Sequence, residues 1–218
     1  SNLQNASNSG YDRRPMSKPL AALLLAFAIG ASPAPASAQP ALSKVEGPDV
    51  VSRDGSGGVT VRAIHVPDGL RVDGRLDEEI YLTTPPITDF LQQEPDEGRV
   101  ATERTEAWVF FDDNHIYVAA RCWDSRPDRR VANEMRRDTS QLRQNDTFGV
   151  LFDTFHDKRN GYIFYANAIG GLADSQVTDE GPPYADWNTV WDVRTADFDG
   201  GWTIEMVIPF KSLRYQPG

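Results

Sequence analysis

The stretch TEAWVFFDDNHIYVAARCWD (105–124) decides the fold class, because its side chains alternate with a period of two. Val109 and Phe111 lie in the apolar register before the turn formers at 112–114, and Val118 lies in the apolar register after them. Two β-rich runs joined by a short polar turn are typical of an antiparallel hairpin. The stretch therefore predicts two paired strands.

Two more hairpins follow along the chain. Strands are predicted at 148–152 and 162–168, and the turn HDKRNG (156–161) between them contains an Asn-Gly pair that accepts positive φ angles. A third pair of strands, at 190–196 and 202–208, is joined by an Asp-Gly-Gly turn. The dominant pattern is thus a series of short antiparallel strands.

Helical patterning is scarce, with one turn expected at 77–81 and Asp77 as its N-cap. The predicted fold is all-β, an antiparallel, jelly-roll-like sandwich over residues 59–218. Trp202 is expected in the core, whereas Trp108 and Trp123 are expected on an outer face. We also expect a further, closing strand downstream of the last predicted strand.

The N-terminal part has the features of an exported protein. Residues 16–38 contain a lysine, a short apolar run and an Ala-Ser-Ala end, as in a secretory signal peptide. The apolar run is ten residues long, whereas a membrane-spanning helix needs about 20. Residues 1–15 are interpreted as an upstream extension or scar and 39–58 as a linker, and the expected location is the periplasm, the outer membrane or the cell surface.

The composition limits the kinds of partner. The formal net charge is −10, with 32 acidic and 22 basic residues, so nucleic acid is not an expected partner. Cys122 is the single cysteine, which excludes an intrachain disulfide, and its apolar register predicts a buried side chain.

Catalytic patterns are absent from the sequence. The three histidines are scattered, with no zinc-binding spacing, and there is no G-x-S-x-G motif. The acidic pairs nearly all fall at predicted turns, where Asp caps its own backbone. We therefore predict no catalytic residues.

A calcium site is a possible use for loop carboxylates, since calcium binds six to eight oxygen ligands. Asp124 and Asp128, in the sequence WDSRPDRR after a predicted strand, are the best candidates. Ordinary capping of the loop backbone is the alternative role for both.

Four segments together resemble one family: VRAIHVPDGLRVDGRLDEEIY (61–81), 105–124, NDTFGVLFDT (145–154) and DGGWTIEMVIPFKSLRY (199–215). They resemble the family 9 carbohydrate-binding modules, in particular the family-9-like domain that begins a group of bacterial outer-membrane proteins of unknown function. The resemblance implies a β-sandwich, export, carbohydrate binding without catalysis, and a membrane β-barrel downstream. Polysaccharide catabolism is implied only by association.

The chain departs from the family at the sugar site. Family members hold a terminal sugar between two tryptophans, and Arg143-Gln144-Asn145 stands where the first of these rings is expected. Gly149 falls near the family's acidic ligand, and Tyr81 replaces a common tryptophan. The second ring belongs to a segment beyond Gly218. The resemblance therefore implies the fold more firmly than the site.

The candidate carbohydrate ligands are Trp187, Trp191, Arg143, Asn145 and Asp174. Aromatic rings suit sugars, because axial C–H bonds pack on the ring while hydroxyls reach polar groups. Trp187 is expected in an exposed loop, whereas Trp191 is expected to plug one end of the sandwich. The alternative is a structural or protein-interaction domain of an outer-membrane barrel protein that has lost its sugar site; an enzyme is the least favoured function.

Overall fold

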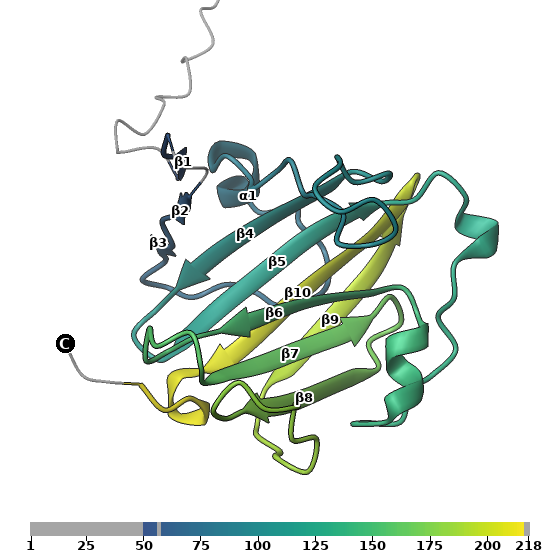
Figure 1. Cartoon of the computed structure of the whole chain (residues 1–218). Helices are drawn as coiled ribbons and strands as arrows, with labels where there is room; N and C mark the ends of the chain where they lie inside the picture. The colour runs from purple at the N-terminus through teal and green to yellow at the C-terminus, as the bar shows by residue number, and fades with distance from the viewer. Residues whose placement is uncertain (1–49, 56–57, 216–218) are drawn as a thin grey trace, which may run out of the picture. The chain divides into compact units, whose positions relative to one another are not determined.

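The structure is a computed structural model that describes residues 50–55 and 58–215, all within the compact unit Ser43–Gly218. Two sheets pack face to face, and β6, β7 and β8 cross one face of the larger sheet (Figure 1). The predicted all-β, antiparallel sandwich is confirmed, as are its three hairpins. Across the described residues, no helix has the length and apolar character needed to cross a membrane.

The larger sheet has five strands in the spatial order β3-β4-β5-β10-β9. In that order their bounds are Ile64–His65, Thr105–Phe111, His115–Trp123, Gly201–Pro209 and Asp192–Phe198. All neighbours pair antiparallel except β3 and β4, which are parallel.

The smaller sheet has three antiparallel strands in the order β6-β7-β8. Their bounds are Thr147–Phe152, Gly161–Asn167 and Leu172–Val177. Among the described residues β6 pairs with β7 alone, so it is an edge strand. The strand β8 has no counterpart in the sequence prediction.

The remaining elements are short. A hairpin pairs β1 (Val51–Arg53) with β2 (Val59–Val61), so part of the predicted linker forms a strand. The helical turns are α1 Glu79–Thr83, η1 Pro127–Arg129, η2 Ser140–Gln144 and η3 Phe210–Ser212. The predictions for residues 1–38 and for 39–49 lie outside the described residues.

The main core fills the space between the sheets. The larger sheet contributes Ile204, Met206 and Ile208, and β7 contributes Phe164; all four side chains are fully buried. Trp202 also lies in this core, as its register predicted. Alternate residues of β10 point into the core because successive side chains of a strand lie on opposite faces.

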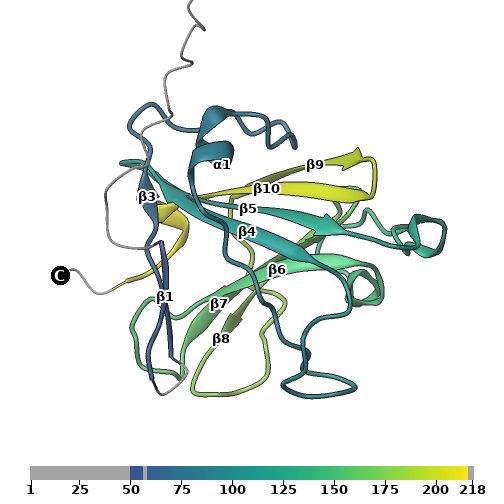
Figure 2. The same ribbon diagram turned by 90° about the horizontal axis from the view of Figure 1, so that it is seen from above.

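The other face of the larger sheet is also covered, which the sequence analysis did not predict. The segment that contains α1 packs on this face (Figure 2), and Trp108 beneath it is only 3% exposed. Trp108 donates its indole N–H to the carbonyl of Thr84 (2.9 Å). Trp108 does lie on the face of the larger sheet that points away from the smaller one, but this face is covered, because residues 66–84 form a lid over it.

A buried carboxylate fastens this lid. Glu205 of β10 accepts hydrogen bonds from the hydroxyl of Tyr81 (2.7 Å) and from the backbone N–H groups of Asp73 (2.9 Å) and Gly74 (2.7 Å). Burial raises the pKa of Glu205 above its usual range although these bonds act to lower it. The expected N-cap is also wrong: the helix begins at Glu79, and Asp77 instead pairs with Arg71 (3.0 Å).

We predict that Phe164→Ala costs about 3–5 kcal/mol of unfolding free energy, because the ring is fully buried and contacts Trp187 and Trp191. Phe148→Ala should cost clearly less, since Phe148 is only partly buried on the edge strand β6. Urea unfolding of both variants makes the comparison. Equal losses would mean that β6 is covered in solution.

A second prediction concerns the β4–β5 turn. Burial acts to raise the pKa of Asp112, but hydrogen bonds from Tyr117, Asn114 and His115 outweigh it and lower the pKa to about 2. Because the folded pKa is depressed, this contribution is complete above the ordinary value of 3.8 and is lost as the pH falls toward 2.

Urea titrations at pH 6 and at pH 3 should therefore show a smaller acid loss of stability in Asp112→Asn than in the wild type. Asp113→Asn is the matched control, because the Asp113 side chain is 94% exposed. An unchanged acid sensitivity in Asp112→Asn would contradict the assignment.

Candidate functional site

Three of the sequence candidates meet at one side of the sandwich. Asp174 of β8 is completely buried and accepts hydrogen bonds from the indole N–H of Trp191 (2.9 Å) and the backbone N–H of Thr189 (3.1 Å). Arg137 donates to the same carboxylate. Burial raises the pKa of Asp174 despite these partners. The carboxylate is thus engaged inside the protein.

The two tryptophans close the space between the sheets. Trp191 is 6% exposed and lies edge-on against Phe164 (5.3 Å between ring centroids). Trp187 is partly buried and packs on Tyr162 (5.0 Å) and Phe164 (6.1 Å). Both rings pack inward, so Trp187 is less exposed than expected from a loop residue.

Asn145 has a structural role at the entrance to β6. Its side-chain oxygen accepts from the backbone N–H groups of Asn133 (2.9 Å) and Glu134 (3.2 Å) and from the amide of Asn167 (3.0 Å). These bonds connect the long 124–146 segment to the end of β7. Arg143, two residues earlier, lies in a different environment.

The outer surface of the smaller sheet contains the accessible aromatic platform. Phe148, Val150 and Phe152 of β6 pack on the core, so the alternate residues of this strand face outward. The cross-strand register adds the alternate residues of β7. We call this surface the β6–β7 face; it consists of Thr147, Gly149, Leu151, Ile163 and Tyr165.

Arg143 and Tyr165 form a stacked pair on the β6–β7 face. The guanidinium of Arg143 lies over the Tyr165 ring, 5.3 Å from its centroid, and the Nε–H donates to the phenol oxygen (3.3 Å). Such a cation–π contact favours this orientation of the flexible arginine. Arg143 is the sequence candidate that reaches this face.

Gly149 makes room for this pair. It lies directly opposite Tyr165 in the register, and a Cβ at position 149 would approach the Tyr165 Cβ to 2.8 Å. A side chain there would force β7 to shift at Phe164 and Tyr165. The glycine that departs from the family pattern therefore permits the close approach of the two strands beside Tyr165.

A hollow of about 310 Å³ lies at the other end of the β6–β7 face. Leu151, Gly161 and Val177 line it together with the charged residues Asp153, Lys158, Arg159 and Glu180. Arg159 is held by Asp179 (3.2 Å) and Glu180 (3.6 Å). From Gly161 to Tyr165 the strand runs about 13 Å at about 3.3 Å per residue.

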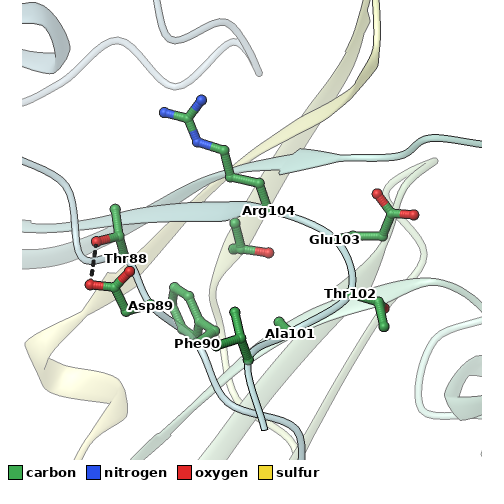
Figure 3. Close-up of a pocket in the computed structure, with 9 residues that line it drawn as sticks. Thr88, Asp89, Phe90, Ala101, Thr102, Glu103 and Arg104 are labelled. Carbon is green, nitrogen blue, oxygen red and sulfur yellow. Dashed lines mark hydrogen bonds between the residues drawn. The ribbon is translucent and has the colours of Figure 1, made fainter.

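A larger pocket, of about 460 Å³, lies under the loop that precedes β4 (Figure 3). Phe90 lies at its base, and Thr88 donates to Asp89 (3.2 Å). In Figure 3 the guanidinium of Arg104 extends away from Phe90. It stacks on Trp123 (4.3 Å) and donates to Glu106. Thr88 and Arg104 thus bond to other protein groups rather than into this pocket.

The calcium candidates do not meet in a cluster. Asp124 accepts from the backbone N–H of Arg126 (2.9 Å) and from Arg130 (3.4 Å), and Asp128 lies in η1. Within residues 50–55 and 58–215, no group of three or more His, Cys, Asp or Glu side chains is placed to hold a metal ion.

Burial raises the pKa of Cys122 to about 12, which keeps its thiol protonated.

The comparisons with known proteins identify the family. The family model described as "Carbohydrate family 9 binding domain-like" matches residues 72–217. None of the curated proteins matches the chain.

Solved structures give a more distant likeness. Family 9 carbohydrate-binding modules of Caldicellulosiruptor kristjanssonii, solved with glucose and with cellotriose, are 20% and 19% identical, with TM-scores of 0.43 and 0.42. The glucose complex covers 72% of this chain and 71% of its own, and the cellotriose complex 68% and 67%.

A protein of Bacteroides uniformis described as carbohydrate-binding is 11% identical, with a TM-score of 0.50 over 69% of this chain and 72% of its own; this likeness concerns the fold alone. The family model, in contrast, covers well over half of the sequence. The chain therefore belongs to the carbohydrate family 9 binding domain-like family.

Proposed function

We propose that this domain binds an oligo- or polysaccharide on its β6–β7 face, without chemical turnover. Family membership supports carbohydrate as the ligand class. The Arg143–Tyr165 pair is the observation that supports the β6–β7 face as the binding site. It presents a partly exposed ring and an oriented guanidinium next to Gly149, which has no side chain.

The chemistry of the pair suits a sugar. A pyranose packs its axial C–H bonds on an aromatic ring, while its hydroxyls need donors and acceptors at the rim. Tyr165 provides the ring and a phenol hydroxyl, and Arg143 provides N–H donors. Leu151 and Ile163 extend the apolar floor toward the hollow at Gly161.

The same face lacks the groups that glycoside hydrolysis uses. That reaction needs two carboxylates about 5 to 9 Å apart across the scissile bond. None of the five residues of the β6–β7 face is acidic; the carboxylates of Asp153 and Glu180 lie at its far end. This supports a binding module rather than an enzyme.

The other four sequence candidates are assigned a structural role, in which they stabilise the strands that form the face. They are Trp187, Trp191, Asp174 and Asn145. Trp191 and Asp174 are bonded to each other inside the sandwich, and Trp187 covers Phe164. Losing them should disturb the support of β7 and β8, which hold the face. Trp187 is only partly buried and can contact a ligand directly, so it is included in the test below.

Calorimetric titration of the full-length chain with a panel of neutral and acidic oligosaccharides tests the proposal. We expect saturable heat with at least one sugar and a loss of affinity of tenfold or more in Tyr165→Ala, because the stacking surface is removed. Leu82→Ala is the matched control, since Leu82 is 77% exposed and lies in α1 on the covered face of the other sheet.

Circular dichroism and thermal unfolding establish that each variant is folded. A folded wild type that gives no heat with any sugar would favour the alternative, an interaction domain without a sugar site. Binding that survives Tyr165→Ala but disappears in a folded Trp187→Ala would move the platform to the edge of the sandwich.

We also propose that the domain is exported and is the N-terminal module of a larger envelope protein, linked to polysaccharide catabolism and followed by a membrane barrel. Support comes from residues 16–38, which have the pattern of a signal peptide. Expression in a Gram-negative host should give a periplasmic or membrane-associated product that begins at Gln39, as read by mass spectrometry. An uncleaved product in the cytoplasm would contradict export.

A further inference from the structure

Carboxylates neutralise nine of the sixteen arginines in the described part of this acidic chain. These nine form ion pairs with Asp or Glu: Arg71, Arg99, Arg104, Arg121, Arg130, Arg136, Arg137, Arg159 and Arg194. Arg143 is exposed and forms none within the described part of the chain. Its guanidinium is instead oriented by the Tyr165 ring.

The contact with Tyr165 leaves the two terminal nitrogens of the Arg143 guanidinium available for a ligand. Nε is the atom that donates to the phenol oxygen, and the two terminal nitrogens make no hydrogen bond to other described residues. A planar guanidinium with free terminal N–H groups matches the two oxygens of a carboxylate. Because the ring already holds the side chain, little rotational freedom is lost on binding.

The β6–β7 face itself does not oppose an anion at this position. Thr147, Gly149, Leu151 and Ile163 are uncharged, so the face adds no carboxylate next to Arg143. The net charge of −10 repels anions at long range, but at about 0.15 M salt such repulsion is screened within about 8 Å. A close, oriented contact therefore outweighs the distant field.

We infer that the sugar bound on the β6–β7 face is acidic: a uronic acid unit whose ring packs on the part of Tyr165 that Arg143 leaves uncovered, and whose carboxylate accepts two hydrogen bonds from Arg143. This inference rests on the proposed carbohydrate-binding function and names its substrate class. It also assigns stacking to Tyr165 and recognition of the charge to Arg143. A neutral sugar would therefore use only the Tyr165 ring.

Titration calorimetry with trigalacturonic acid, its methyl ester and cellotriose tests the inference on the full-length chain. The methyl ester has the same sugar ring without the charge. At about 0.15 M salt, we expect the acid to bind at least tenfold more tightly than the ester, a difference of about 1.4 kcal/mol. The difference should shrink as salt is raised.

Arg143→Gln should abolish the preference for the acid while weaker binding to the sugar ring remains, and Arg143→Lys should restore only part of it. Arg126→Gln is the matched control: it removes one charge from another exposed arginine, outside the β6–β7 face. The control should keep the wild-type preference.

The outcomes separate the two proposals. Equal binding of acid and ester overturns the acidic substrate and leaves carbohydrate binding intact. A preference that survives Arg143→Gln overturns the assigned residue, and tighter binding of a sulfated oligosaccharide than of the uronate overturns the carboxylate. No heat with any sugar from a folded sample overturns the proposed function itself.

Discussion

The pairing of β10 with β5 is the constraint on which the rest of the domain depends. The two strands pair from Gly201 and Trp123 at one end to Pro209 and His115 at the other, in the middle of the larger sheet. Because both faces of this ladder are buried, each strand sends alternate side chains into two separate cores. A slip of one residue would exchange the two sets, placing Glu205 against Phe164 and Ile204 against Tyr81.

This two-sided burial explains which features could be predicted from the sequence. Alternation and turn chemistry were sufficient for the three hairpins and for Trp202, since both are local signals. Alternation could not reveal that the polar face of the sheet is covered, because Glu205 and Thr203 have the composition of a solvent face. They are buried through bonds to Tyr81 and to Gly74, more than 120 residues away in the sequence. Likewise β8, with Asp174 in its middle, lacks the alternation of a half-buried strand because its carboxylate is bonded inside the protein.

The candidate site follows the same rule. Tryptophans were the obvious sugar platforms from the sequence, but a large ring next to a partly open sandwich is also an efficient plug, and Trp191 shows that outcome. Tyr165 was missed because the pairing that places Gly149 opposite Tyr165 became visible only in the fold. The turn between β6 and β7 has its positive φ angles at His156 and Lys158, whereas the sequence predicted them at the Asn-Gly pair. Arg143 was chosen for its position relative to the family pattern, and its ring partner became visible only through the fold.

Gly149 and Tyr165 also limit how this surface can change in evolution. A Cβ at 149 would lie 2.8 Å from the Tyr165 Cβ and 3.0 Å from the Phe164 carbonyl oxygen, so any residue other than glycine needs β7 to move away from β6. Such a shift would carry Tyr165 with it. Relatives with a side chain at this position should therefore hold β7 differently, and their outer face should present a different surface.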